Sequence, residues 1–416
     1  MPPEQTAMSA VVIIGAGQAG LQVAESLRSG GYAGTIDVFG NEPHLPYHRP
    51  PLSKAWLAGE LEVTQLTMRS ADVLARKNIN LHIGVTATRI DRHSKHVILS
   101  DGGNHTYTHL VLATGASPRA LSLPGGDAKG VLALRTMADA NAMAERLAVC
   151  AEQQLPVVVV GGGFIGLEVA ATARKKGIAV TVLEAAPRLL GRVLAPVLSD
   201  WYAKLHQGHG ATLLLNARLQ QIEVDASNSV TGLRMEDGTQ LSAGLVVVGI
   251  GVTANDQLAR EAGILCERGI VVDACGRSSD AAIFAAGDCA ARKMPDGSLL
   301  RLESVQNATE QGKSVAASIM GQERPFTATP WFWSDQYDKK LQMAGLSVGA
   351  TEWLLRGDMQ SGSFSVYHLR AGNLLAVDSV NAAKDHMQAR KLLDAKCTPT
   401  AAQIQDTGFD LSSLLH

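Results

Sequence analysis

The same order of strand, glycine turn, helix and strand occurs twice in this chain of 416 residues, and no other feature restricts its fold as strongly. The first copy runs from Ala10 to Phe39 and the second from Leu155 to Leu183. Each begins with an unbroken β-branched run, as buried parallel strands do, and continues with apolar residues at helical spacing. Strands that alternate with helices in this way are typical of doubly wound α/β domains. We therefore predict two such domains.

The glycine turns of both copies share the spacing G-x-G-x-x-G. The first glycine of this motif forms a tight turn, the second lets the backbone approach a pyrophosphate, and the third lets the helix pack closely on the strand. The helix that follows directs its free N–H groups at the phosphates. A single match can be a structural turn, but two matches in full context predict two Rossmann-like dinucleotide-binding domains. The glycines are Gly15, Gly17 and Gly20 in the first copy and Gly161, Gly163 and Gly166 in the second.

An acidic residue about 20 positions after such a turn accepts hydrogen bonds from the adenosine ribose. Glu184 takes this place in the second copy. Its carboxylate would repel a 2′-phosphate, which predicts NAD(H) rather than NADP(H), although Arg188 and Arg192 nearby could weaken the preference. Glu184 could also be a simple exposed strand-end residue. In the first copy Gly40 stands at the acidic place, so Asn41 or Glu42 would have to contact the ribose.

The rest of the chain extends the strand pattern and then changes character. Further apolar runs, each ending at a glycine-bearing turn, are His109–Ala113, Leu245–Ile250 and Ile283–Ala286. After about Phe326 prolines and tryptophans cluster, and Phe364–Leu369 alternates with the period of two that antiparallel strands show. We therefore predict a C-terminal α+β domain beside the two dinucleotide-binding domains.

Composition argues against several classes of protein. Lys and Arg total 37 and Asp and Glu total 39, a net charge of −2, whereas nucleic-acid binding needs an excess of positive charge. No apolar run reaches the roughly 18 residues of a membrane span, and the first nine residues lack the features of a signal peptide. The 5 cysteines contain no C-x-x-C pair, which predicts neither a disulfide framework nor a metal site. A metal-free protein of the reducing cytoplasm, with no nucleic-acid or membrane partner, is expected.

Short motifs spread over nearly the whole chain add to the two glycine turns. They are Arg49–Lys54, Ala113–Gly115, Leu167–Glu168, Ala286–Cys289, Glu303–Val305 and Pro330–Tyr337. Together they resemble the FAD-dependent NADH:ferredoxin reductases of oxygenase systems, the putidaredoxin-reductase-like family within the glutathione-reductase-like superfamily. The resemblance implies FAD in the first dinucleotide site and NADH in the second. It also implies a 2Fe-2S ferredoxin as the partner of a monomer or homodimer.

The resemblance also assigns individual cofactor contacts. Gly15, Gly17, Ala19 and Gly20 would hold the FAD pyrophosphate, and Asp288 would bond the flavin ribityl chain. Trp333 could line the flavin edge, or it could be a core anchor at a domain junction. The positions similar to further cofactor contacts in the family are Asn41, Arg49, Lys54, Ala87, Thr114, Gly115, Arg135, Gly251, Val305 and Trp333.

Lys54 and Glu168 are the catalytic candidates that the resemblance implies. A cation at Lys54 would stabilise the negative charge that the flavin gains on reduction, although a surface lysine fits the spacing too. Glu168 lies two residues after Gly166 on an apolar helix. It would either orient the nicotinamide carboxamide or pair with Lys54, since a buried carboxylate needs a partner.

No cysteine lies between Gly40 and Leu61, where disulfide reductases of the superfamily carry a redox pair and the related peroxidases and oxidases carry one cysteine. Electrons would therefore leave from the flavin, to a ferredoxin that serves a cytochrome-type monooxygenase or a Rieske dioxygenase. A rubredoxin or quinone reductase, an NADH oxidase, and a flavin-bearing NADH sensor of the apoptosis-inducing-factor type remain alternatives. The predicted domains are residues 1–115 with 249–326 for FAD, 116–248 for NAD, and 327–416 at the C-terminus.

Overall fold

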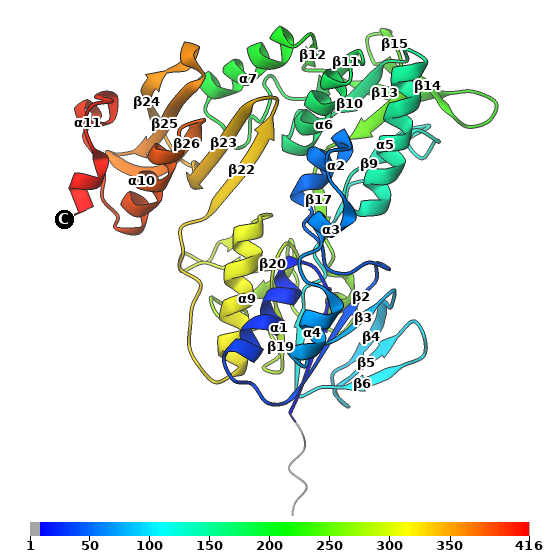
Figure 1. Ribbon diagram of the computed structural model, residues 1–416, viewed down its shortest axis with the longest axis vertical. Helices are drawn as coiled ribbons and strands as arrows, with labels where there is room; N and C mark the ends of the chain where they lie inside the picture. Colours follow the sequence, from blue (N-terminus) through cyan, green and yellow to red (C-terminus); the bar gives the residue numbers. More distant parts are fainter. Residues whose placement is uncertain (1–8, 416) are drawn as a thin grey trace, which may run out of the picture. The chain divides into compact units, whose positions relative to one another are not determined.

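Figure 1 shows the computed structural model of the protein, which describes residues 9–415. Its contacts divide the chain into two compact units. Unit 1 contains the chain up to His48, Val63–Ser117 and Thr253–Ala328, and unit 2 contains Arg49–Glu62, Pro118–Val252 and the chain from Thr329 onward. The division into three domains stays a prediction. Apart from Ser9, the N-terminal segment without signal-peptide features lies outside the described residues.

A five-stranded parallel sheet forms the centre of unit 1, in the order β19-β7-β1-β2-β3. The β-branched run in β1 is buried on both faces, because Val11 and Ile13 join one apolar cluster while Val12 and Ile14 join the other. The predicted strands of the first copy are confirmed. The strands of this sheet are β1 (Ala10–Ile14), β2 (Thr35–Gly40), β3 (Asn80–Ile83), β7 (His109–Leu112) and β19 (Ile283–Ala285).

Two helices cover one face of this sheet, α1 (Gln18–Ser29) and α9 (Val305–Ile319), which lie side by side in Figure 1. They cross closely at Gly312, where a Cβ atom would lie 2.9 Å from the Cβ of Gln22. The other face packs against shorter elements. The remaining elements of unit 1 are α3 (Val63–Leu66), α4 (Ala71–Arg76), β4 (Ala87–Asp91), β5 (His96–Leu99), β6 (Asn104–Thr106), α8 (Gln257–Glu261), β18 (Ile270–Val272), β20 (Ala290–Lys293) and β21 (Leu299–Leu300). At the boundary with unit 2, β8 (Ala116–Pro118) pairs with β17 (Val252–Ala254).

Unit 2 contains a second five-stranded parallel sheet, in the order β12-β11-β10-β16-β9, whose edge strand β9 precedes β10 in the chain, whereas the matching edge strand β19 of unit 1 comes last. The four valines of β10 are all buried, as its unbroken apolar run predicts. In both sheets the strand that precedes the glycine turn lies between the next strand along the chain and a later strand. The strands are β9 (Val131–Ala133), β10 (Val157–Val160), β11 (Val180–Glu184), β12 (Thr212–Leu215) and β16 (Leu245–Val248).

Helices and a small antiparallel sheet complete this part of unit 2. The helix after the glycine turn, α6, is buried along most of its length because its residues are small or apolar, with Glu168 as the charged exception. These elements are α2 (Ala55–Ala58), α5 (Met137–Glu152), α6 (Phe164–Lys175), α7 (Pro196–Gly208), β13 (Leu219–Val224), β14 (Val230–Met235) and β15 (Gln240–Ser242), and a 3₁₀ helix covers Pro50–Ser53.

The C-terminal part of unit 2 is a five-stranded antiparallel sheet in the order β22-β23-β26-β25-β24. The predicted alternating segment Phe364–Leu369 lies within β25. One face of the sheet packs on α10 and α11 through Tyr367, Val377 and Leu392. The elements are β22 (Trp331–Gln336), β23 (Lys339–Gly345), β24 (Glu352–Asp358), β25 (Ser363–Arg370), β26 (Asn373–Val380), α10 (Ala383–Asp394) and α11 (Ala401–Gln405), with 3₁₀ turns at Met359–Ser361 and Leu411–Leu415.

The predicted fold class is confirmed: two parallel α/β sheets of the dinucleotide-binding type and a C-terminal antiparallel sheet with helices. Among residues 9–415 there is no helix with both the length and the apolar character of a membrane crossing. The same residues contain no group of three or more His, Cys, Asp or Glu side chains placed to hold a metal ion.

Candidate active site

The first glycine turn follows β1, at the carboxyl edge of the unit 1 sheet where β7 lies on one side and β2 on the other. Gly15 has φ +111°, and a Cβ there would lie 2.1 Å from the carbonyl oxygen of Ala113. A Cβ on Gly20 would lie 1.9 Å from the Gly15 oxygen, whereas one on Gly17 would meet no atom within 4 Å. Two of these glycines therefore allow the chain to pack, and Gly17 faces open space. Because Gly17 is the N-cap of α1 and provides no side-chain cap, the first helix N–H groups remain available to a phosphate.

Thr114 and Gly115 follow β7 at the same edge of the sheet. Asn255 holds this turn, since its backbone oxygen accepts from Thr114 Oγ1 at 2.6 Å and its side-chain amide donates to the Thr114 oxygen at 2.9 Å. Asp288 follows β19 directly after Gly287, which has φ +81° and donates its N–H to Gln311. The structure therefore places Thr114, Gly115 and Asp288 at strand ends next to the first glycine turn. Sequence reasoning missed Asn255, because nothing in its local sequence connects it with a turn 141 residues away.

The other predicted FAD contacts are more scattered within unit 1. Ala19 lies in the first turn of α1, Val305 begins α9 and Ala87 begins β4. Asn41 is exposed just after β2. Gly40, at the usual acidic place, would bring a Cβ to 2.8 Å from the Ala16 Cβ, so a carboxylate does not fit there.

The second glycine turn, in unit 2, has the same geometry as the first glycine turn. Gly161 has φ +110°, and a Cβ there would lie 2.4 Å from the Gly249 oxygen. A Cβ on Gly166 would lie 2.4 Å from the Gly161 oxygen, whereas Gly163 has only that Gly249 oxygen within reach, at 3.8 Å. Gly163 is the N-cap of α6 without a side-chain cap, and Gly251 follows β16 with open space around it. Both turns therefore have the shape that a bound pyrophosphate requires.

Glu184 ends β11 beside this turn, and backbone groups fix its carboxylate. Oε2 accepts from the N–H of Gly162 at 2.7 Å and Oε1 accepts from the N–H of Ala186 at 2.8 Å. An ionised carboxylate has about four lone-pair sites, so acceptor capacity remains for ribose hydroxyls. Arg188 is engaged elsewhere: its guanidinium donates to the carbonyls of Leu194 and Gly191 at 2.6 and 2.8 Å.

Lys54 and Glu168 form an ion pair, which is one of the two arrangements that the sequence left open. Lys54 Nζ lies 2.8 Å from Glu168 Oε2, and the two side chains are 18% and 4% exposed. Ser53 Oγ donates to the same oxygen at 2.5 Å and Ser334 Oγ donates to Oε1 at 2.6 Å. Three donors from two segments of unit 2, the adjacent residues Ser53 and Lys54 and the distant Ser334, therefore converge on one buried carboxylate. The two serines were not predicted, although both lie in motifs that the sequence analysis quoted.

A chain of hydrogen bonds continues from Ser334 into unit 2. Gln336 donates through Nε2 to Ser334 Oγ at 3.2 Å, and its Oε1 lies 2.9 Å from Nε2 of His206. Because an amide oxygen only accepts, His206 carries its proton on Nε2 and accepts from the Tyr337 hydroxyl at Nδ1. Burial lowers the pKa of His206 to about 4. The imidazole is therefore neutral at pH 7.

The low pKa of His206 predicts a loss of stability in mild acid. Between its ordinary pKa of 6.5 and the folded value of about 4, the unfolded chain binds a proton that the folded protein excludes, so the free energy of unfolding falls as pH falls. We expect the titration of His206 to lower the free energy of unfolding by about 2 kcal/mol between pH 6.5 and pH 4.5. Urea unfolding at both pH values measures this difference. His206→Gln keeps a donor to Gln336 and should show a pH dependence smaller by this amount; an unchanged dependence would contradict the assignment.

Arg49, Arg135 and Trp333 also belong to unit 2. Arg49 donates to the backbone oxygen of Arg135 at 2.8 Å, just before α5, so the structure brings these two predicted contacts together. Trp333 is half-buried and lies on β22, 5.5 Å from the ring of Trp331. Successive side chains of a strand alternate between faces, so Trp333 lies on the face opposite to Ser334. Its role at a flavin stays a prediction.

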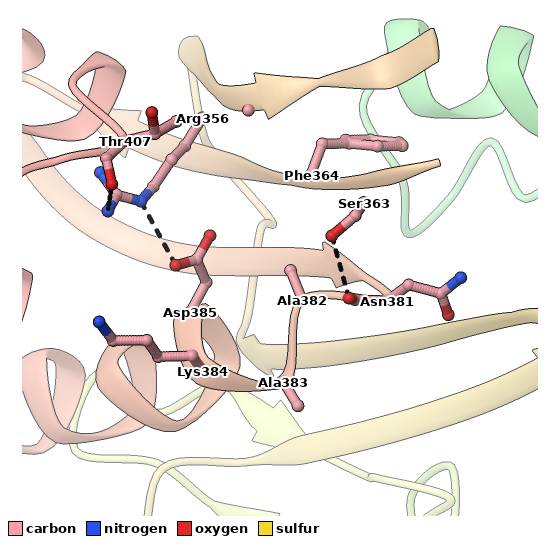
Figure 2. Close-up of a pocket in the computed structure, with 10 residues that line it drawn as sticks. Arg356, Ser363, Phe364, Asn381, Ala382, Ala383, Lys384, Asp385 and Thr407 are labelled. Carbon is pink, nitrogen blue, oxygen red and sulfur yellow. Dashed lines mark hydrogen bonds and ion pairs between the residues drawn. The ribbon is translucent and has the colours of Figure 1, made fainter. Parts of the chain in front are cut away.

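Figure 2 shows a hollow in the C-terminal sheet that none of the predicted site residues lines. Arg356 lines this hollow. Its guanidinium lies 3.3 Å from Asp385 and donates to the backbone oxygens of Asp406 and Phe409 at 2.6 and 2.9 Å. These bonds attach the C-terminal segment to the sheet, which is a structural role.

Comparison with known proteins identifies the family. Residues 9–312 match the family model described as pyridine nucleotide-disulphide oxidoreductase, and residues 331–415 match the one described as reductase C-terminal. The chain belongs to the pyridine nucleotide-disulphide oxidoreductase family. Rhodocoxin reductase of Rhodococcus erythropolis is 45% identical to this oxidoreductase over 402 residues, which make up 96% of this chain and 93% of that protein.

Solved structures agree with this placement. A ferredoxin reductase from Rhodopseudomonas palustris superposes with a TM-score of 0.94 at 41% identity, covering 98% of this chain and 100% of that one. The covalent complex of putidaredoxin reductase with putidaredoxin gives 0.92 at 39% identity, covering 98% of each chain. The resemblance to ferredoxin reductases that the sequence motifs indicate is thereby confirmed, and the chain is an oxidoreductase.

Proposed function

We propose that this oxidoreductase is an NADH:ferredoxin reductase that binds FAD in unit 1 and NADH in unit 2 and supplies a 2Fe-2S ferredoxin of an oxygenase system. The observation that carries the proposal is the pair of matched glycine turns, each with one glycine in open space at an uncapped helix start. The similar proteins support the choice of partner, because one was solved in a covalent complex with putidaredoxin.

Each glycine turn has its own set of candidate cofactor contacts. In unit 1 the backbone at Gly15, Gly17, Ala19 and Gly20 would hold the FAD pyrophosphate, and Asp288 would bond the ribityl chain. The further unit 1 contacts are proposed at Asn41, Ala87, Thr114, Gly115 and Val305. In unit 2 Gly161, Gly163, Gly166 and Glu184 would hold NADH, and further cofactor contacts are proposed at Arg49, Arg135, Gly251 and Trp333.

The Lys54–Glu168 pair is the proposed catalytic element. FAD supplies the chemistry when bound, since it accepts a hydride and releases electrons one at a time. Lys54 contributes a positive charge held in a fixed place, which stabilises negative charge that develops nearby. Glu168 fixes the ammonium group, and Ser53 and Ser334 satisfy the carboxylate oxygens so that both ions can remain buried.

Sulfur takes no part in the proposed electron path. Cys289, beside Asp288, is fully buried, and burial raises the pKa of its thiol, so it is a poor nucleophile. All five cysteines are free thiols, which supports a reducing compartment such as the cytoplasm.

Turnover with a panel of acceptors tests the proposal. Purified protein with NADH should reduce a 2Fe-2S ferredoxin much faster than it reduces oxygen, a quinone or a rubredoxin. Equal rates with ferredoxin and oxygen would refute the ferredoxin assignment, and protein without a flavin spectrum would refute the FAD site.

Asp288→Ala tests the unit 1 cofactor site separately. We expect the variant to fold but to retain little flavin after purification, because it loses a hydrogen bond to the cofactor worth about 1.5–3 kcal/mol. The ratio of flavin absorbance to protein absorbance measures retention. Asp296→Ala, in an exposed turn of the same unit, is the control and should keep its flavin. Full retention in both variants would remove Asp288 from the site.

A further inference from the structure

The loop that follows β11 closes onto the second glycine turn at a single residue, Gly162. The N–H of Leu190 donates to the Gly162 oxygen at 3.0 Å, although Leu190 must adopt the left-handed conformation with φ +53°. The Leu189 side chain is fully buried, and a Cβ on Gly162 would lie 2.6 Å from its Cδ2 atom. The loop therefore lies against the turn at a residue that has no side chain.

Gly162 also contacts the side chain of Glu184. The Gly162 N–H holds Glu184 Oε2 at 2.7 Å, and a Cβ at residue 162 would stand 3.1 Å from that oxygen and 3.4 Å from the Glu184 Cβ. A methyl group would thus press on both Leu189 and Glu184. Leu189 is fully buried, and the Glu184 carboxylate stands within tight contact distance of the added methyl group, so we expect the carboxylate to move away from its backbone donor.

The first glycine turn shows the complementary choice of residues. There Ala16 stands at the place of Gly162 and Gly40 at the place of Glu184, and a Cβ on Gly40 would lie 2.8 Å from the Ala16 Cβ. The first turn therefore combines a side chain at residue 16 with a glycine at the strand end, and the second combines a glycine at residue 162 with the Glu184 side chain at the strand end.

Hydrogen bonds within the same loop also engage the side chain of Arg188. The Arg188 guanidinium bonds to Gly191, Leu194 and the Ser199 hydroxyl, all within one segment of chain, so these contacts would move with the loop as a body. Ala185, the residue next to Glu184, is exposed and uncharged. Arg188, the basic residue nearest to Glu184 in this loop, is therefore not available to a 2′-phosphate, whereas Arg192 further along the loop is exposed.

We propose that Gly162 is a specificity-determining residue for the nicotinamide cofactor, because its missing side chain lets Glu184 take the fixed position from which its carboxylate selects an unphosphorylated ribose. This inference rests on the proposed binding of NADH in unit 2. Gly162 itself acts through Glu184, as a positioning residue. Its effect should therefore disappear when Glu184 is absent.

The test is a double-mutant cycle read as the ratio of two dissociation constants, for NADP⁺ and NAD⁺, measured by calorimetry on the flavin-loaded protein. Gly162→Ala should lower this ratio about tenfold or more, because the displaced Glu184 carboxylate no longer accepts a charge-assisted hydrogen bond from the ribose of NAD⁺ and no longer repels the 2′-phosphate of NADP⁺. Glu184→Ala should lower it similarly, and adding Gly162→Ala to Glu184→Ala should change it less than about twofold.

Gly244→Ala is the matched control. Gly244 is also a buried glycine of unit 2, where a Cβ would lie 2.5 Å from the Leu155 Cβ, but it precedes β16 at the other end of the sheet. It should lower thermal stability and leave the ratio unchanged. If Gly162→Ala fails to fold, Gly162→Ala with Leu189→Ala restores space for the methyl group and keeps its contact with Glu184.

Two results would overturn the inference: a ratio in Gly162→Ala equal to that of the unaltered protein, or an equal shift in the presence and absence of Glu184. Failure of the unaltered protein to bind NAD⁺ at all would instead refute the proposed function, and the inference with it.

Discussion

Lys54→Met should destabilise the protein by about 3 kcal/mol, because it leaves the Glu168 carboxylate buried at 4% exposure without its cation. The two serine donors remain and keep the loss at the lower end of the range for a broken buried pair. Urea unfolding at pH 7 measures the change. We also expect slower reduction of the flavin by NADH in stopped-flow experiments, since the fixed positive charge is lost.

The double variant Lys54→Met with Glu168→Gln shows whether the lost stability of Lys54→Met comes from the unpaired Glu168 carboxylate or from lost packing of the Lys54 side chain. It removes the unpaired carboxylate and should recover most of the stability, but not the rate of flavin reduction. Lys77→Met is a control, since Lys77 pairs with Glu25 on the surface at 39% exposure and should cost less than about 1 kcal/mol. A loss in Lys54→Met no larger than in this control would show that the pair does not stabilise unit 2.

Gly17→Val and Gly163→Val should each abolish one cofactor site while the protein stays folded. A Cβ at Gly17 would meet no atom within 4 Å, and a Cβ at Gly163 would meet only the Gly249 oxygen, at 3.8 Å. A valine would stand where a pyrophosphate must approach, and the loss of two charge-assisted hydrogen bonds lowers affinity about 1000-fold. Gly17→Val should therefore lose flavin. Gly163→Val should keep flavin and lose binding of NADH.

Gly15→Ala is the contrasting variant for this experiment. Its Cβ would stand 2.1 Å from the Ala113 oxygen at φ +111°, so it should lower the melting temperature strongly whether or not flavin is present. Absorbance at the flavin band and calorimetric unfolding give both readouts. Flavin retained by Gly17→Val, or lost equally from Gly163→Val, would contradict the assignment of one cofactor to each turn.

Features that depend on local sequence could be predicted well. The valine run of β10 and the apolar run of β1 form buried strands, as unbroken β-branched runs favour. The first glycine of each turn adopts a positive φ that glycine adopts easily, and the third allows close packing. The same logic placed Glu184 at the end of β11. These predictions needed only neighbouring residues.

Features that depend on contacts between distant segments could not be predicted. Ser334 lies 166 residues from Glu168, and Asn255 lies 141 residues from Thr114, so no local pattern marks either as a partner. Serine and asparagine occur so often at exposed turns that their presence alone carries little information. The pairing of Lys54 with Glu168 could be offered only as one of two alternatives, since the apolar helix indicates that the carboxylate needs a partner but not which partner it meets.

The convergence of Ser53, Lys54 and Ser334 on Glu168 limits how this chain can be recombined with its relatives. Ser334 is contributed by β22, the first strand of the C-terminal sheet, so exchanging that sheet for the one of a relative also exchanges one donor to the buried carboxylate. A chimera whose incoming strand lacks a hydroxyl at this position would inherit an unsatisfied oxygen deep in unit 2. The C-terminal sheet and one donor of the ion pair are therefore inherited together, and a graft of this sheet must keep a hydroxyl at position 334.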